Sequence, residues 1–138
     1  MAAEAVGRLL AERGAIVVCG GRGGVMEAAC RGAKSAGGAT LGILPGLDRA
    51  EANEFVDFAV PTGLGEARNA LVVRAADALI AVGGAWGTLS EIALALRAGK
   101  TVVGIHTWEL SRAGGAVDGI IRASSAEEAV ELALPADR

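Results

Sequence analysis

Two spacings of apolar residues alternate along this chain. Short apolar runs, many of them β-branched and closed by glycine or proline, predict strands at residues 15–19, 39–44, 55–60, 77–82, 101–105 and 119–122. Apolar residues at helical spacing predict helices at residues 3–13, 25–36, 65–75, 88–97 and 124–134, the last capped by Ser124-Ser125. Residues 47–54 are expected to form a loop or a single helical turn, and residues 107–118 a connection.

Short strands that alternate with helices are typical of right-handed βαβ crossovers. The predicted fold class is therefore α/β, with a doubly wound, mainly parallel, Rossmann-like sheet. In such a sheet ligands bind beyond the carboxyl ends of the strands, so function is expected in the loops after Cys19, Leu44, Val60, Val82 and Ile105. The length of 138 residues predicts one domain over residues 1–138.

Composition excludes several classes of protein. Glycine supplies 21 of 138 residues without a collagen-like period and beside 52% hydrophobic residues, which predicts tight turns and close backbone approach instead of disorder. The net charge of −3 and the scattered basic residues argue against a nucleic-acid partner. The longest uncharged stretches are broken by glycines, so no membrane span is predicted.

The start of the chain carries acidic residues and an amphipathic pattern where a signal peptide would be basic and then apolar, so a cytoplasmic location is expected. Cys19 and Cys30 have no matching pair of ligands and the chain has one histidine, so no metal site is predicted. Both cysteines are expected to be small buried apolar residues.

The strongest chemical signal is VGGAWGTLSE at residues 82–91, where a glycine-rich turn joins a predicted buried strand to a helix. Because glycines let the backbone approach an anion and a helix N-terminus favours negative charge, this turn is predicted to cradle a phosphate. The predicted ligand contacts are Gly83, Gly84, Trp86, Gly87 and Thr88. Two alternatives stay open: Thr88 and Glu91 form a capping box, and Trp86 is a wedge between helices instead of a stacking partner for a base.

A second glycine-rich turn, GGRGG at residues 20–24, also joins a predicted strand to a helix. Its order departs from the GxGxxG fingerprint, so NAD is not predicted. Gly20, Gly21, Gly23 and Gly24 either permit tight packing or contact the ligand of the first turn in a nucleotide-sized pocket.

Arg68 is predicted in the first turn of a helix, where a positive charge opposes the helix dipole. Its planar fork suits phosphate oxygens, so Arg68 is predicted to serve an anion or a carboxylate outside its helix. The alternative is a solvated arginine paired with Glu66 or Asp77. His106 is not predicted to be catalytic, because a lone histidine after a strand is more often a packing or surface residue.

Together these segments resemble the LOG (Lonely Guy) family and its relatives long mislabelled lysine decarboxylases. The resemblance rests on GGRGGVMEAACRGA at residues 20–33, GLGEARN at 63–69 and VGGAWGTLSEIALAL at 82–96, and it covers nearly the whole chain. The family's loop Pro-Gly-Gly-x-Gly-Thr-x-x-Glu falls on residues 83–91, and its arginine falls on Arg68.

The resemblance implies hydrolysis of the N-glycosidic bond of a nucleoside 5′-monophosphate, with Glu91 and Arg68 as catalytic residues and no cofactor required. A carboxylate at Glu91 would stabilise an oxocarbenium-like transition state and orient water. Arg68 would hold the phosphate or the ribose. Relatives are dimers or larger, with sites near the interface, so a homodimer or higher homo-oligomer is expected.

The chain also departs from the family pattern. The family motif Met-His-x-Arg-Lys is GEARN here, at residues 65–69, while Gly83 replaces a proline and Ala85 a glycine. With these departures the chain is similar to a sister branch of the family. That branch contains nucleotide-binding Rossmann proteins and the molybdenum-cofactor carrier proteins, which bind a pterin phosphate without hydrolysing it.

Relatives in the family begin with a strand and a turn before their first helix, so 138 residues look one strand short. In the usual strand order that strand would be central. We therefore expect either closure of the gap between the strands at Ala15 and Asp77, or an irregular site there, or a true start upstream of Met1.

The leading hypothesis is a homo-oligomeric protein that binds a nucleotide or phosphorylated cofactor at its glycine-rich turns and acts as a phosphoribohydrolase on a nucleoside monophosphate. The alternative is a non-catalytic carrier or sensor of a phosphorylated cofactor such as molybdenum cofactor. Both hypotheses take a small phosphorylated molecule as the partner and exclude nucleic acid and membrane.

Overall fold

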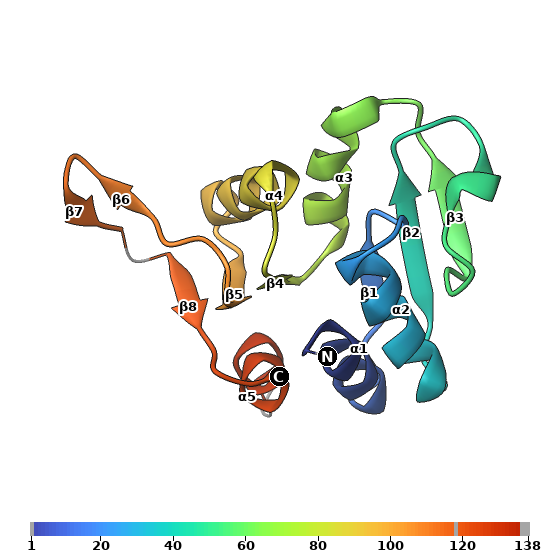
Figure 1. Cartoon of the computed structure of the whole chain (residues 1–138), viewed down its shortest axis with the longest axis horizontal. Helices are drawn as coiled ribbons and strands as arrows, with labels where there is room; N and C mark the ends of the chain where they lie inside the picture. Colours follow the sequence, from blue (N-terminus) through green and yellow to red (C-terminus); the bar gives the residue numbers. More distant parts are fainter. Residues whose placement is uncertain (1, 118, 136–138) are drawn as a thin grey trace.

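The computed structural model describes residues 2–117 and 119–135, and its helices and strands alternate as the sequence predicts (Figure 1). The first part of the chain forms α1 (Ala2–Glu12), β1 (Val17–Cys19), α2 (Val25–Ser35), β2 (Thr40–Leu44), the short 3-10 helix η1 (Arg49–Glu51) and β3 (Phe58–Pro61). The rest forms the 3-10 helix η2 (Gly65–Ala67), α3 (Arg68–Ala75), β4 (Ala78–Val82), α4 (Trp86–Arg97), β5 (Thr101–Ile105), β6 (Ser111–Arg112), β7 (Gly115–Ala116), β8 (Ile120–Arg122) and α5 (Ala126–Ala133).

The main strands form two three-stranded sheets, in the orders β1-β2-β3 and β4-β5-β8, and every pairing in them is parallel. The α/β class with parallel, Rossmann-like strands is thereby confirmed. Within the described residues no ladder joins β1 to β4, so strand pairing does not close the gap expected between these two segments. The single sheet assumed from the sequence is therefore two sheets.

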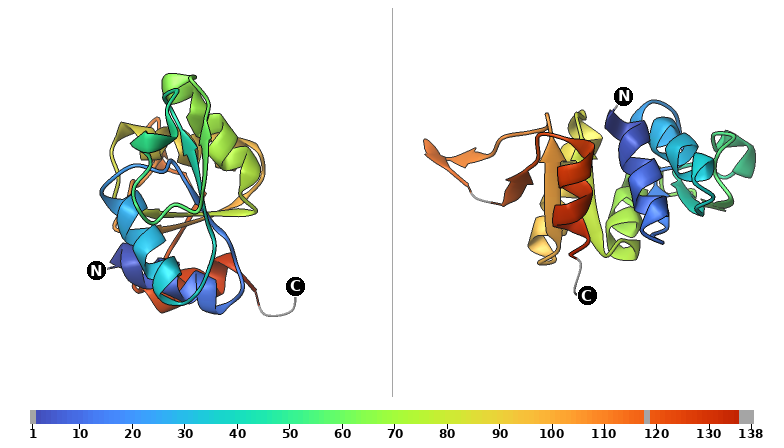
Figure 2. Two further views of the ribbon diagram at one scale, coloured as in Figure 1. Left: turned by 90° about the vertical axis from the view of Figure 1, so that its right-hand side faces the viewer. Right: turned by 90° about the horizontal axis from the view of Figure 1, so that it is seen from below.

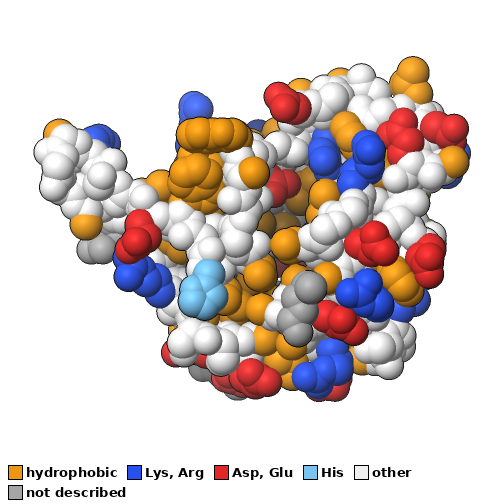
Figure 3. Space-filling model, viewed as in Figure 1, with side chains coloured by type: hydrophobic (Ala, Val, Ile, Leu, Met, Phe, Trp, Pro, Cys, Tyr) orange, Lys and Arg blue, Asp and Glu red, His pale blue; other side chains and the backbone are white. Residues whose placement is uncertain are grey.

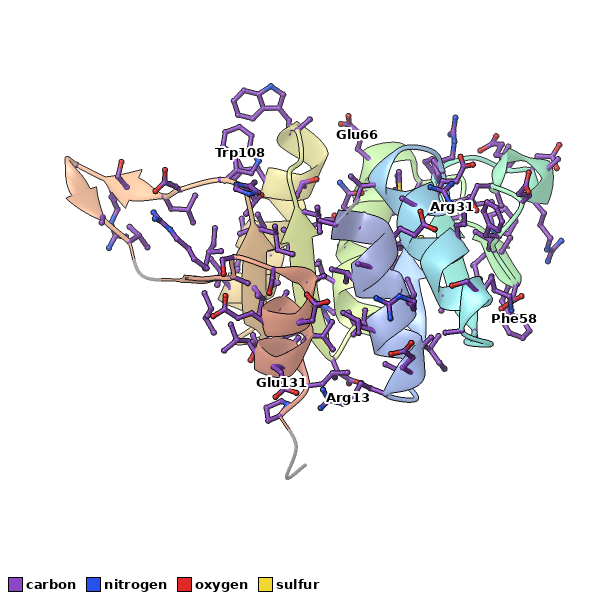
Figure 4. All side chains as sticks on the ribbon, turned by 60° about the horizontal axis from the view of Figure 1, so that its bottom comes forward. Arg13, Arg31, Phe58, Glu66, Trp108 and Glu131 are labelled. Carbon is purple, nitrogen blue, oxygen red and sulfur yellow. The ribbon has the colours of Figure 1, made fainter. Side chains whose placement is uncertain are left out.

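Helices cover both faces of the strands and hold the two sheets together. In Figures 1 and 2, α1, α2 and α5 lie on one face, and α3 and α4 lie on the other. Adjacent residues of β5 point to opposite faces, with Val103 in the core under α1 and α5 and Val102 in the core under α3 and α4. Beyond α1, Arg13 pairs with Glu131 of α5 at 3.3 Å, and both side chains are labelled in Figure 4.

Local side-chain bonds explain where several elements begin. At α5, Ser125 Oγ accepts the Glu128 N–H at 3.1 Å, and the Glu128 carboxylate accepts the Ser124 N–H at 2.7 Å, which confirms the predicted cap. The strand predicted from residue 55 begins only at Phe58. Before Phe58 the chain is held by a side chain instead of a strand ladder, since the Phe55 carbonyl accepts a hydrogen bond from the Thr40 hydroxyl at 2.6 Å.

A second difference lies in the connection predicted at residues 107–118, which contains the antiparallel hairpin β6–β7. Ala113 and Gly114 turn it with φ of +53° and +83°, as a tight two-residue hairpin requires. Its strands are two residues long, too short for an alternating pattern to mark them. In Figure 1 this hairpin extends away from the sheets, and residue 118 lies outside the described residues. None of the described helices has the length and apolar character to cross a membrane.

Candidate functional site

The turn between β4 and α4 has a backbone suited to binding an anion. Gly83 and Gly84 have φ of +59° and +115°, in the region that favours glycine. A Cβ on Gly84 would lie 2.5 Å from the Thr88 side chain, so the helix start leaves no room for one. Ala85 is the N-cap of α4 and supplies no side-chain hydrogen bond. The first N–H groups of α4 are thus not used by a cap, and they can serve a bound anion.

The capping box proposed for Thr88 and Glu91 is wrong. Helix α4 begins at Trp86, ahead of the predicted residue 88, so Thr88 lies inside the first turn instead of at its cap. No side-chain hydrogen bond caps this helix, which leaves the Thr88 hydroxyl free of that role.

A shallow hollow of about 480 Å³ opens beside this turn and is lined by Gly83, Gly84, His106, Thr107, Trp108 and Glu109. The loop after β5 is tied to the glycine turn, because the Thr107 hydroxyl donates to the Gly83 carbonyl at 2.6 Å and the Trp108 indole N–H donates to the Ala85 carbonyl at 3.2 Å. The turn and this loop therefore form one wall of backbone and side chains.

Two tryptophans meet at the rim of the hollow. The ring centroids of Trp86 and Trp108 are 5.1 Å apart with an interplanar angle of 37°. Trp86 is 75% exposed, so its proposed role as a wedge between helices is wrong. Figure 3 shows hydrophobic side chains gathered over α4 on this face, and Figure 4 shows Trp108 beside the start of α4.

In the turn between β1 and α2, the first two glycines are packed against protein. A Cβ on Gly20 would lie 1.7 Å from the Arg68 Nη1 atom, and one on Gly21, whose φ is +79°, would lie 2.7 Å from Leu44. Asn53 further holds the turn, since its backbone N–H donates to the Gly21 carbonyl at 2.8 Å. The close-packing explanation therefore holds for this half of the turn.

The other half of that turn is exposed. Gly24 is the N-cap of α2 with φ of +68° and no side-chain cap, and a Cβ on it would meet nothing within 4 Å. A Cβ on Gly23 would meet only the Glu27 carboxylate, at 3.9 Å. These two glycines are free to face a ligand, and their role as ligand contacts stays a prediction.

Arg68 is the first residue of α3, and its guanidinium lies against Gly20, after β1, and against the end of β2. Its Nη1 donates to the Ile43 carbonyl at 3.0 Å, and its Nε is buried without a hydrogen-bond partner. Among the described residues it makes no ion pair with Glu66 or Asp77, so the alternative of a solvated, paired arginine is wrong. A buried donor with no partner is unusual in a folded protein.

Glu91 lies on α4 within electrostatic reach of Arg68. Burial raises the pKa of the Glu91 carboxyl, and the positive charge of Arg68 partly opposes that rise. The carboxyl therefore holds its proton more readily than an exposed glutamate does. The two residues that the resemblance implied as catalytic are thus electrostatically coupled, although their role in a reaction stays a prediction.

Cys19, at the end of β1, and Cys30, on α2, lie with their sulfur atoms 3.5 Å apart. The expected small buried residue is confirmed for Cys30, whereas Cys19 is half-buried and its Sγ also accepts the Gly21 N–H at 3.3 Å. The hydrogen bond from Cys30 lowers the pKa of Cys19, against the effect of burial, and the same bond with burial raises the pKa of Cys30. Within the described parts of the chain, no group of three or more histidine, cysteine or acidic residues is placed to hold a metal ion.

The structure thus brings Gly20 and Arg68 into contact, with Glu91 within electrostatic reach of Arg68, and places Gly83 to Thr88 at the start of α4. The loop after Ile105 was expected to carry function, and the structure adds its residues Thr107 to Glu109 to the site, beside His106, which has a left-handed φ of +47°. Their position was available as a signal, because they follow the carboxyl end of a parallel strand.

Comparison with known proteins places the chain in a family. The sequence profile of the SLOG cluster4 family matches residues 1–130. The molybdenum cofactor binding protein from the phototrophic bacterium Rippkaea orientalis has a similar structure, with a TM-score of 0.85 and 40% identity, and the match covers 94% of this chain and 82% of that one. The molybdenum cofactor carrier protein from Chlamydomonas reinhardtii is also similar, with a TM-score of 0.78 and 37% identity over 93% of this chain and 81% of that one.

An uncharacterized protein from Archaeoglobus fulgidus is 50% identical over 100 residues, which are 72% of this chain and 66% of that protein's length. The structural matches agree with the α/β fold. The chain belongs to the SLOG cluster4 family.

Proposed function

We propose that this protein is a carrier that binds molybdenum cofactor, a phosphorylated pterin, and does not hydrolyse it. The similar proteins from Rippkaea orientalis and Chlamydomonas reinhardtii support a cofactor-binding role. The observation in this chain that carries the proposal is the start of α4, where positive-φ glycines precede an uncapped helix beside a hollow.

The residues present fit the phosphate of such a cofactor. The N–H groups of the first turn of α4 and the Thr88 hydroxyl would bind phosphate oxygens, and Gly84 keeps the approach free of a Cβ. Arg68, whose charge acts on Glu91 of α4, would add positive charge to the site. Since the described residues offer no cluster of metal ligands, the protein would hold the cofactor by its phosphate and ring, and the cofactor would keep its own redox chemistry as cargo.

Hydrolysis of a nucleoside monophosphate is the second candidate, and the coupled pair Arg68 and Glu91 is the observation that favours it. A carboxyl group with a raised pKa beside an arginine suits acid or base work at a glycosidic bond. The two candidates differ in one measurable respect, because a carrier keeps its ligand intact and a hydrolase releases free base.

The binding proposal is tested with molybdenum cofactor released from a molybdoenzyme and passed with the protein through a gel-filtration column. We expect molybdenum and oxidised pterin to co-elute with the wild-type protein and to be lost with Gly84→Ala, because the new Cβ would push Thr88 out of the cradle. Gly99→Ala is the matched control: Gly99 has φ of +76° at the other end of α4, and nothing lies within 4 Å of its Cβ position. Equal loss from both variants, or no co-elution at all, would contradict the proposal.

The catalytic candidate is tested by incubating the protein with a panel of nucleoside 5′-monophosphates and measuring free base by chromatography. The carrier proposal predicts no base release from the wild type, with unchanged cofactor retention in Glu91→Gln. Release of base that Glu91→Gln abolishes would instead establish the hydrolase and overturn the carrier.

A further inference from the structure

The hollow beside α4 is larger than a phosphate requires. It is a shallow hollow, open to solvent, with a volume of about 480 Å³, and its lining residues combine the glycine turn with a tryptophan and a glutamate. We propose that this hollow binds the ring of the ligand, and that Trp108 and Glu109 select a planar heterocycle with an amino-pyrimidinone edge, as in a pterin or a guanine. This inference rests on the proposed function, because the phosphate of the same ligand would occupy the start of α4.

Trp108 is held as a fixed aromatic wall. Its indole N–H donates to the Ala85 carbonyl, its side chain packs against the apolar core beneath α4, and the Trp86 ring lies tilted beside it, with centroids 5.1 Å apart at an interplanar angle of 37°. A ring fixed in this way loses little conformational freedom on binding. Stacking of a flat heterocycle on an aromatic side chain contributes affinity for any base, so Trp108 supplies binding without choosing the ring.

Glu109 is the residue that would determine which heterocycle is bound. Glu109 lines the hollow with its side chain 71% exposed, and Arg122 pairs with one of its carboxylate oxygens, so the other oxygen is available to a ligand. A carboxylate only accepts hydrogen bonds, whereas the amino group and ring N–H of an amino-pyrimidinone are two adjacent donors. Adenine presents an acceptor nitrogen beside its amino group, so it would leave the carboxylate facing a lone pair.

The hollow and the phosphate cradle share Gly83 and Gly84, so one ligand can reach both. The phosphate would lie at the N–H groups of α4 and the ring on the side of the loop after β5. That loop is bonded to the turn through Thr107 and Trp108, which fixes the two subsites relative to each other.

The two tryptophans of this chain are both at this site, so intrinsic tryptophan emission reports on it directly. The test titrates the full chain with GMP, AMP and ribose 5-phosphate and follows the emission. We expect GMP to quench the emission with an affinity at least tenfold higher than that of AMP. Ribose 5-phosphate is expected to compete with GMP without itself quenching.

Substitutions of Glu109 and Trp108 distinguish the selection of the ring from its stacking. Glu109→Gln is expected to weaken GMP about tenfold to hundredfold, because the amide lacks the second acceptor, and to strengthen AMP, because the amide N–H can donate to the adenine ring nitrogen beside the amino group. Trp108→Leu, read through Trp86, is expected to weaken GMP and AMP alike. The control is Glu127→Gln on α5, an exposed carboxylate outside the hollow, which should change neither affinity.

Equal affinities for GMP and AMP, or a Glu109→Gln protein that still prefers GMP, would overturn the ring subsite. If the cofactor co-elutes with the protein but GMP and AMP are not distinguished, the carrier proposal stands and this inference fails. If GMP is preferred through Glu109 but molybdenum cofactor is not retained, the ring subsite stands and the carrier proposal fails.

Discussion

The two glycine-rich turns follow buried parallel strands and enter helices of almost equal length, yet their surroundings differ. The first half of the turn after β1 is filled by the protein itself, since the Arg68 guanidinium lies against Gly20 and Leu44 lies against Gly21, while Gly23 and Gly24 are open. The turn after β4 is open, with an uncapped helix start and a hollow beside it. Glycine in the first case makes room for neighbouring side chains, and in the second it leaves backbone N–H groups accessible.

This difference teaches that a glycine-rich strand-to-helix turn does not by itself identify a ligand site. What decides its role is which atoms approach the missing Cβ, and those atoms come from elements distant in sequence. The following predictions separate the two roles of glycine, beginning with the largest expected effect.

The turn after β1 should be limited by packing. Gly21→Ala places a Cβ 2.7 Å from Leu44 at a φ of +79°, so we expect a loss of about 2 to 3 kcal/mol in the free energy of unfolding. Gly23→Ala, two positions along in the same turn, should change it by less than about 0.5 kcal/mol, because its Cβ has space. Urea denaturation of the two variants measures both values, and equal losses would contradict the packing explanation.

Gly20 and Arg68 should be energetically coupled. Gly20→Ala forces the guanidinium away, since the new Cβ would lie 1.7 Å from Nη1, but in an Arg68→Ala background the space is already vacant. We expect the cost of Gly20→Ala to fall by about 1 kcal/mol in that background. A double-mutant cycle in urea measures this coupling, and additive effects of the two substitutions would show that the contact is not made.

Glu91 should make stability depend on pH. Because burial raises its pKa in the folded state, the folded protein binds the proton more tightly than the unfolded chain. The protonated Glu91 carboxyl therefore contributes to the free energy of unfolding below the ordinary glutamate pKa. This contribution is lost as the pH rises through the pKa of Glu91 in the folded protein. Glu91→Gln should therefore gain stability relative to the wild type between about pH 4 and pH 7, as measured by urea melts at several pH values. A constant difference across that range would refute the raised pKa.

The smallest effect concerns the thiols under the turn after β1. The lowered pKa of Cys19 predicts faster alkylation by iodoacetamide than at Cys30, which is fully buried. Cys30→Ala should slow the reaction at Cys19 near neutral pH, because the sulfur loses the hydrogen bond that stabilises its thiolate. Peptide mass spectrometry of partially alkylated protein measures both sites, and earlier labelling at Cys30 would be the contrary result.

Much of the fold could be predicted from the sequence because its signals are local. Apolar runs and helical spacing marked the elements, and β5 was predicted at its observed bounds, Thr101–Ile105. The hairpin β6–β7 was missed because two-residue strands carry no periodicity, and β3 began late because Thr40 bonds the backbone at Phe55. The separation into two sheets depends on hydrogen bonds between distant strands, which no local pattern encodes.

The candidate site divides in the same way. The turn at residues 83–88 was found because its glycines and helix start are contiguous, and its residues need only local geometry. The loop after β5 was expected to carry function, but Trp108 and Glu109 were not named within it, because they reach the hollow only through the pairing of β4 with β5 and the bond from Trp108 to Ala85. The contact of Arg68 with Gly20 likewise joins α3 to the end of β1.

The lack of a ladder between β1 and β4 has a consequence for how the molecule opens. Two separate sheets present twice as many edges as one continuous sheet of the same strands, and an edge strand has backbone groups without a ladder partner. Amide hydrogens on the facing sides of β1 and β4 should exchange with solvent faster than those of β2 and β5, which are paired on both sides. Because helices, not strand pairing, join the halves, fluctuations that part α1 from α5 would let each sheet exchange on its own.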